Sequence, residues 1–225
     1  MNEMMKDFDT PYDEEYARLC ILRYFPSLAL CLELNKKDPP DLIDKQNSVG
    51  IEVVRAISQA DAERENTFYK CLYKKETDVG EKLINKIKKN GGRFHFDPES
   101  GLVCTGGSIK DNLYQLIGER IVSKTQKLNK PNYGKGLSIK HDYLFIYNSG
   151  GFCFENDLGE AIDTIYKEQL TKYPRRYTKI IIYCDHDIFL YDILEHTVVH
   201  ELISDKEIDE MKETALYNAE IFREK

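Results

Sequence analysis

With 225 residues, 41% of them hydrophobic, and no stretch close to the roughly 20 apolar residues of a membrane helix, the chain is expected to form one soluble, cytoplasmic domain without a membrane partner. Six cysteines without CxxC spacing argue against a zinc ribbon or a disulfide scaffold. The net charge of −7 argues against a protein that coats nucleic acid by bulk electrostatics, although bases outnumber acids between Lys110 and His141.

The first part of the chain is expected to contain two helices and then two strands. Apolar residues at helical spacing predict a helix over residues 12–24, and after Pro26 a second, short helix over residues 27–34. Residues 41–44 and 50–54 are short β-type runs joined by polar residues, a pattern that predicts adjacent antiparallel strands.

Helices and strands alternate along the rest of the chain. The expected helices are at 58–89, 111–128 and 157–172, and the expected strands at 93–96, 102–105, 141–148, 179–184, 188–193 and 197–203. Ser204 and Glu207 form a capping-box pattern that predicts a C-terminal helix. This order favours an α/β sandwich around a mixed sheet.

Two acidic residues in the predicted strand pair carry the chemistry. Asp41 follows two prolines, and Glu52 interrupts a run that otherwise has the composition of a buried strand. A partly buried carboxylate needs a partner, and Mg²⁺ or Mn²⁺ is bound by one or two carboxylates. Such an ion supports phosphodiester hydrolysis because it provides hydroxide near neutral pH. For either residue alone, a turn cap or a solvent-facing position is the more frequent role.

The pattern PPDLID…GIEVVRA resembles the PD-(D/E)XK nuclease superfamily, in which Pro-Asp precedes an acid-x-Lys on the next strand. Pro40 and Asp41 match the first half, and Glu52 matches the acid, with Val54 in the place of lysine. The resemblance covers about residues 10–150. It implies a restriction-endonuclease-like α/β/α sandwich as a single domain over residues 1–225, with the C-terminal strands and helix completing the sheet. It also implies a metal-dependent nuclease in which Asp41 and Glu52 bind Mg²⁺ or Mn²⁺.

Some branches of that superfamily carry the lysine on the following helix. Lys124 is the leading candidate here because it shares a helical stripe with three apolar residues, and Lys127 and Arg120 are second choices. A lysine whose stem covers apolar surface while its head reaches water is the alternative for Lys124. Glu33 resembles the helix acid that many relatives add to the metal shell, with a solvated residue as its alternative. Arg55 has two candidate partners, phosphate and Asp44.

The resemblance implies nucleic acid as the partner, DNA rather than RNA, and leaves a homodimer open. Four basic residues are expected to contact the phosphate backbone: Arg120, Lys127, Lys130 and Lys135. The alternative is an inactive nuclease-fold binding or interaction module, which the valine at position 54 and the acidic net charge allow. His196 and His200 are expected to be ordinary histidines on a strand rather than zinc ligands.

Overall fold

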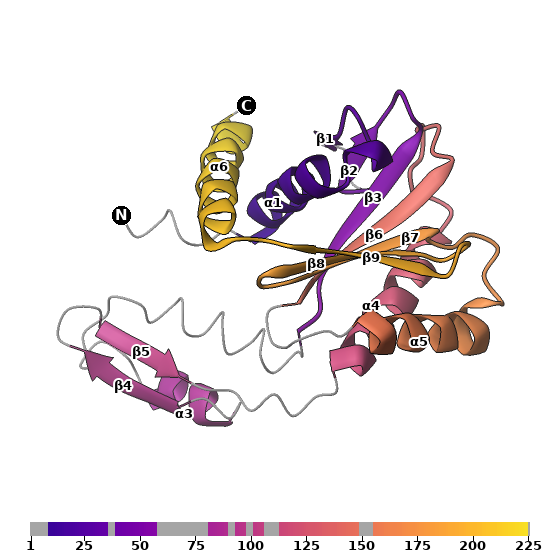
Figure 1. Ribbon diagram of the computed structural model, residues 1–225. Helices are drawn as coiled ribbons and strands as arrows, with labels where there is room; N and C mark the ends of the chain where they lie inside the picture. Colours follow the sequence, from indigo (N-terminus) through magenta and orange to yellow (C-terminus); the bar gives the residue numbers. More distant parts are fainter. Residues whose placement is uncertain are drawn as a thin grey trace. The chain divides into compact units, whose positions relative to one another are not determined.

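The computed structural model describes residues 9–35, 39–57, 81–89, 93–97, 101–105, 113–148 and 155–224 (Figure 1). The chain divides into two compact units, one formed by residues 1–56 with 113–225 and a smaller one formed by residues 57–112. The sequence predicted a single domain over residues 1–225. The smaller unit is an insertion within that range, between residues 56 and 113 of the larger unit. Each unit is described by itself below.

The larger unit is built on a mixed sheet of seven strands in the order β1-β2-β3-β6-β7-β8-β9. The strands are β1 (Glu33–Leu34), β2 (Leu42–Asp44), β3 (Val49–Arg55), β6 (His141–Asn148), β7 (Lys179–Cys184), β8 (Asp187–Asp192) and β9 (Thr197–Leu202). β1, β2 and β3 are antiparallel, β3, β6 and β7 are parallel, and β7, β8 and β9 are antiparallel. The predicted α/β class with a mixed sheet is confirmed.

Helices cover both faces of this sheet (Figure 1). α1 (Asp9–Tyr24) and α6 (Asp205–Glu224) pack against one face, and α4 (Leu113–Leu128) and α5 (Glu155–Ile165) pack against the other. Alternation along β6 feeds both cores: Phe145 belongs to the cluster with α1 and α6, whereas Leu144 and Ile146 belong to the cluster with α4 and α5. Burial of both faces explains why the central strands are almost continuously apolar.

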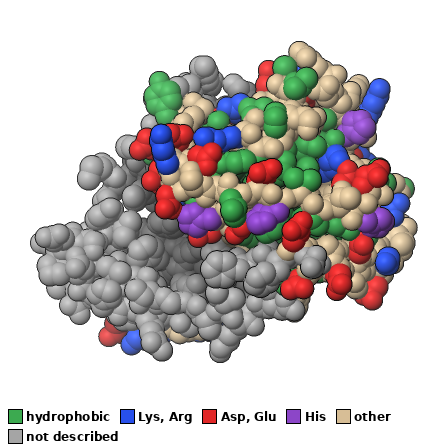
Figure 2. Space-filling model, in the orientation of Figure 1, with side chains coloured by type: hydrophobic (Ala, Val, Ile, Leu, Met, Phe, Trp, Pro, Cys, Tyr) green, Lys and Arg blue, Asp and Glu red, His purple; other side chains and the backbone are tan. Residues whose placement is uncertain are grey.

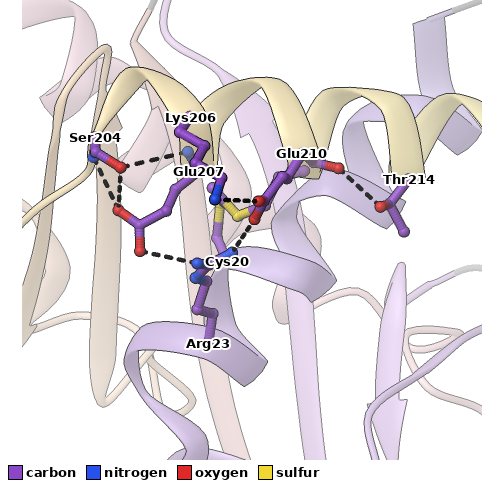
Figure 3. Close-up of polar contacts among 8 residues, drawn as sticks. Cys20, Arg23, Ser204, Lys206, Glu207, Glu210 and Thr214 are labelled. Atoms are coloured by element: carbon purple, nitrogen blue, oxygen red, sulfur yellow. Dashed lines mark hydrogen bonds and ion pairs between the residues drawn. The ribbon is translucent and has the colours of Figure 1, made fainter.

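The predicted capping box starts α6 (Figure 3). The Ser204 hydroxyl donates to the Glu207 carboxylate at 2.7 Å and accepts from the Glu207 N–H at 3.4 Å. Arg23 at the end of α1 reaches Glu207 at 2.9 Å and Glu210 at 3.4 Å, while the Cys20 thiol lies 3.9 Å from the Met211 sulfur. These contacts join the first and last helices of the larger unit.

One element prediction was wrong. Residues 27–34 do not form a second helix: a 3₁₀ turn, η1 (Pro26–Leu28), is followed by β1, which pairs with β2 through Glu33 opposite Ile43. Pairing with a neighbouring strand overrides the local helical spacing. The helix expected over 157–172 is present as α5, which ends at Ile165 and continues as a π-helical turn, η3 (Tyr166–Leu170).

The smaller unit contains α3 (Glu81–Lys89), β4 (Arg93–Asp97) and β5 (Gly101–Thr105). β4 and β5 form an antiparallel pair, with Arg93 opposite Thr105, as the sequence predicted. The first part of the helix expected over 58–89 lies outside the described residues. No helix in the described ranges has the length and apolar character needed to cross a membrane.

Candidate functional site

The acid of the Pro-Asp segment, Asp41, directly precedes β2, and the acid of the Gly-Ile-Glu-Val segment, Glu52, lies in the neighbouring strand β3. β2 and β3 are antiparallel with Leu42 opposite Ile51, and the same register carries Asp41 to the position opposite Glu52. Directly opposite residues of an antiparallel pair project from the same face. Burial raises the pKa of Tyr177 well above its usual range, and the charges of Glu52 and Asp41 both add to the rise. We infer that both carboxylates lie on the face that carries Tyr177.

Backbone contacts hold Asp41 beside β3. Its Oδ2 accepts a hydrogen bond from the Val53 N–H at 2.6 Å, and its carbonyl oxygen accepts from the Asn35 N–H at 2.8 Å. The Asn35 side chain donates to the Pro40 carbonyl at 2.7 Å. A Cβ at Gly50 would stand 3.0 Å from the Pro40 ring, so the glycine lets the Pro-Asp segment pack closely against β3. This packing leaves Asp41 only 7% exposed.

Glu52 lies inside the sheet, fully buried, next to Leu144 of β6. The ammonium groups of Lys124 and Lys127 approach the same carboxylate oxygen, Oε1, at 2.7 and 2.5 Å. The Tyr133 hydroxyl donates to Oε2 at 3.3 Å. Because an unpaired buried carboxylate is costly, these three partners explain how Glu52 is tolerated in a core strand.

α4 supplies both lysines. Ile117 and Ile121 bury one stripe of this helix against the sheet, at 1% and 0% exposure, and Lys124 continues that stripe. Lys124 therefore points toward the sheet, as the stripe predicted. Lys127 follows three residues later on the adjacent turn and reaches the same acid. The side chains of Lys124 and Lys127 remain 19% and 33% exposed, so both ammonium groups lie between the buried carboxylate and solvent.

A second ion pair, between Arg175 and Asp142, lies against the ring of Tyr133. Arg175 binds Asp142 through two hydrogen bonds of 2.7 and 2.8 Å, and its guanidinium lies 5.3 Å from the centre of the Tyr133 ring. Burial raises the pKa of Asp142 above its ordinary value, although the Arg175 charge opposes that rise. Asn129 fixes the Arg175 backbone by accepting from its N–H at 3.2 Å and donating to its carbonyl at 2.8 Å.

These supporting residues were missed by the sequence reasoning. Tyr133 follows α4 in a stretch of turns, and Arg175 precedes β7, so no short motif connects them with Glu52. Asp142 did carry a usable signal, since it is an acid inside a strong apolar strand, as Glu52 is. The same argument that drew attention to Glu52 would have identified it.

The structure does not bring Glu33 to Glu52. Glu33 lies in an edge strand rather than near a helix end, its side chain is 67% exposed, and its carboxylate lies 3.7 Å from Lys45. Arg55, for which phosphate and Asp44 were both left open as partners, pairs with Asp13 at 2.6 and 2.8 Å. Asp44 accepts backbone hydrogen bonds instead, including one from the Asn47 N–H at 3.0 Å.

The remaining basic candidates lie on α4 or in the turns that follow it. Arg120 lies half-buried on the helix, and Lys130 and Lys135 are exposed in the turns that follow it. Figure 2 shows acidic and basic side chains intermingled on one face of the described residues. Any contact with a phosphate backbone would therefore be local, in keeping with the acidic net charge.

Separate acids hold the two histidines of the C-terminal hairpin. His196 lies in the turn before β9 with a positive φ of 52°, and its Nδ1 is 3.0 Å from Asp163. His200 lies in β9 with its Nε2 2.6 Å from Asp187. These contacts give each histidine an acidic partner of its own.

The site offers two carboxylates to a metal ion. Over the described ranges, no group of three or more His, Cys, Asp or Glu side chains is arranged to hold a metal. Mg²⁺ and Mn²⁺ often take only one or two protein carboxylates and complete their shells with water and phosphate, so Asp41 and Glu52 are the acids that would have to hold such an ion. Comparisons of the chain with protein-family models, with characterised proteins and with solved structures gave no significant match.

Proposed function

We propose that the chain is a Mg²⁺- or Mn²⁺-dependent phosphodiesterase that hydrolyses nucleic acid, DNA in the first place. One observation carries the proposal: Glu52, the buried acid opposite Asp41, is contacted by Lys124 from the following helix at 2.7 Å. In the nuclease superfamily a lysine occupies the position that corresponds to Val54. A lysine that takes over this role from another element would have to lie close to Glu52, as Lys124 does.

The division of work among the residues follows from their chemistry. Asp41 and Glu52 would hold the ion, which supplies a hydroxide near neutral pH and offsets charge on the phosphate. Lys124 would orient the attacking water and stabilise negative charge as it develops on the phosphate oxygens, because its ammonium group is held by Glu52 while its side chain as a whole remains 19% exposed. Tyr133, with Arg175 and Asp142 behind it, would keep the Glu52 carboxylate in one orientation.

The chain order of the elements supports the same proposal. α1, β1, β2, β3, α4 and β6 follow one another in the larger unit, with β3 and β6 parallel. The resemblance to PD-(D/E)XK nucleases, which rests on the Pro-Asp and Gly-Ile-Glu-Val motif, includes a helix–strand–strand–strand–helix–strand order, and here one of the three strands is β1, in a segment that was expected to be helical. The ligands would come from β2 and β3 and the lysine from α4, so the candidate site and the element order agree.

A second candidate function, an inactive binding module with the same fold, is favoured by a different observation. The carboxylate of Glu52 is fully buried, and two ammonium groups already compensate its charge. Such a cluster is complete without an ion, and buried ion pairs occur in proteins for structural reasons alone. On this alternative the chain would take up no Mn²⁺ in a manner that depends on Asp41.

Cleavage assays with matched variants test the proposal. We expect the purified chain to nick DNA with Mg²⁺ or Mn²⁺, and Asp41→Asn and Glu52→Gln each to reduce the rate by about 100-fold or more, as when a group that stabilises transition-state charge is lost. Glu33→Gln is the control, because this carboxylate is exposed outside the site and its loss should leave the rate unchanged. A chain that cuts neither DNA nor RNA with either metal, and shows no calorimetric Mn²⁺ uptake, would favour the binding module.

A further inference from the structure

The two units of the chain differ in net charge. The smaller unit, residues 57–112, holds 10 Lys and Arg against 9 Asp and Glu, a net charge of +1, so the total of −7 leaves −8 on the larger unit. A net negative charge repels a polyanion, whereas Lys and Arg side chains neutralise its phosphates. The smaller unit is therefore the part of the chain whose charge least opposes contact with nucleic acid.

The basic residues of the smaller unit concentrate on α3 and the start of β4. The sequence over residues 82–96 contains five Lys and Arg and no Asp or Glu. Lys82 and Lys89 are seven residues apart, about two turns of α3, and so lie on one face of the helix. Both are exposed, as is Asn85 between them, whereas Ile84 is half-buried. The helix thus presents a basic face to solvent.

Helix stability alone does not explain this face. The helix dipole favours cations in the last turn, which suits Lys89, but Lys82 is the second residue of α3, where a positive charge opposes the dipole. Neither lysine forms an ion pair with another residue that the structure describes. An anionic partner outside the chain gives Lys82 a role that helix stability does not.

The spacing on α3 suits a nucleic-acid backbone. At about 1.5 Å of rise per residue, Lys82 and Lys89 are separated by roughly 10 Å along the helix axis. Phosphates of one DNA strand follow each other at about 3.4 Å along the duplex axis, so the two ammonium groups can reach different phosphates of the same strand. The Asn85 amide between them can donate a hydrogen bond to a phosphate oxygen. Such contacts position a duplex without reading its sequence.

The smaller unit is joined in the chain to both elements of the candidate site. The chain enters this unit after Ala56, four residues beyond Glu52, and leaves it at Leu113, the first residue of the helix that carries Lys124. DNA held by α3 is therefore tethered to the candidate site. Tethering raises the local concentration of a ligand at a second site on the same chain.

We propose that the exposed face of α3, formed by Lys82, Asn85 and Lys89, binds the phosphate backbone of DNA. The inference rests on the proposed function for its choice of polyanion. It adds to the lysines that follow α4 a second contact surface, in the inserted unit. This surface supplies affinity and salt dependence and takes no part in the chemistry.

The salt dependence of DNA binding tests this surface on the full chain. Fluorescence anisotropy with labelled duplex DNA is measured without divalent cations, so that cleavage and metal binding do not enter the result. Lys82→Gln/Lys89→Gln should make the slope of log affinity against log salt concentration shallower by about 1.8, because each lost phosphate contact removes about 0.9. Lys82→Arg/Lys89→Arg keeps both charges and should keep the slope.

The matched control removes two exposed lysines of α6. Lys206→Gln/Lys212→Gln changes the net charge by the same amount and should leave the slope unchanged. An unchanged slope in the α3 variant, or an equal fall in the α6 control, would overturn the α3 surface and leave the proposed function standing. The expected fall in a chain that never cleaves DNA with Mg²⁺ or Mn²⁺ would support the surface and favour the binding module. A chain that binds no DNA even at low salt would overturn the surface.

Discussion

Glu52 is the residue on which the larger unit depends most clearly. A wholly buried carboxylate in a central strand is retained only when its charge is matched, and here both matching charges come from one helix. Whatever the activity, Lys124 and Lys127 therefore contribute to stability as a pair. Either lysine alone still leaves Glu52 with an ammonium partner.

Removing both lysines tests this pairing. We expect the double variant Lys124→Met/Lys127→Met to lower the free energy of unfolding by about 3 kcal/mol, because it leaves an uncompensated buried charge. Each single variant should cost about 1 kcal/mol or less, since the other lysine stays within reach. Urea denaturation measures all three. A double variant as stable as the parent chain would mean that Glu52 is not enclosed as described.

Gly50 has an equally specific role beside Asp41. An added Cβ would lie 3.0 Å from both Pro40 and Ile139, a distance that forces one of them to move. We expect Gly50→Ala to lower the free energy of unfolding by about 1–2 kcal/mol through overpacking. Because Pro40 precedes Asp41, the variant should also weaken Mn²⁺ binding in calorimetry. Unchanged stability together with unchanged Mn²⁺ affinity would contradict the close packing of the Pro-Asp segment.

Among the elements, α6 gives the clearest pH-dependent prediction. The hydrogen bonds from Ser204 lower the pKa of Glu207 from its ordinary value of 4.5 to about 2, and the nearby Arg23 contributes in the same direction. A lowered folded-state pKa means that the stabilisation is present above pH 4.5 and is lost as the pH falls toward 2.

Ser204→Ala should weaken both effects by removing the hydroxyl hydrogen bond, while the backbone N–H of residue 204 still donates to Glu207. We expect a loss of about 1 kcal/mol of stability at neutral pH, as is usual for a lost N-cap. The pKa of Glu207 should rise back toward its ordinary value, which carboxyl-detected NMR titration can measure. Thr214→Ala, on the same helix but away from the cap, is the matched control. A Glu207 pKa that is the same in the variant and the parent chain would show that Ser204 does not hold this carboxylate.

Elements that form from a local apolar pattern could be predicted from the sequence, whereas an element that forms only by pairing with another strand could not. β3, β6 and β7 carry long apolar runs and α4 a clear apolar stripe, so their places followed from local pattern. β1 has two residues and exists through its pairing with β2, an interaction that the spacing of apolar residues alone does not encode. The same limit applies to the site. Lys124 was predictable because it lies on that stripe, whereas Tyr133 reaches Glu52, and Arg175 reaches Tyr133, only through the fold.

At the scale of the whole molecule, an acidic chain is proposed to bind a polyanion. The net charge of −7 means that binding must rely on a few local contacts rather than on the overall field. The exposed Lys130 and Lys135, next to the end of α4, are the residues placed to make such contacts beside Lys127. Affinity should therefore be modest, and its salt dependence should be shallow, with a slope of about −0.9 for each phosphate contact.

The double variant Lys130→Gln/Lys135→Gln tests that reading. Each lost phosphate contact should reduce the slope of log affinity against log salt concentration by about 0.9, so the pair should reduce it by about 1.8. Fluorescence anisotropy with labelled duplex DNA, in the presence of Ca²⁺ to prevent cleavage, gives the slope. Lys45→Gln, an exposed lysine beside Glu33, is the control. An unchanged slope would place the phosphate contacts elsewhere on the chain.

The most direct measurement is anomalous diffraction from crystals of the full chain soaked in Mn²⁺. We expect one anomalous peak within coordination distance, about 2.0–2.3 Å, of carboxylate oxygens from both Asp41 and Glu52. Crystals of Asp41→Asn should show no peak at that position. A well-diffracting soaked crystal without manganese between these two acids, or with manganese bound only at other carboxylates, would contradict the metal centre and the nuclease proposal with it.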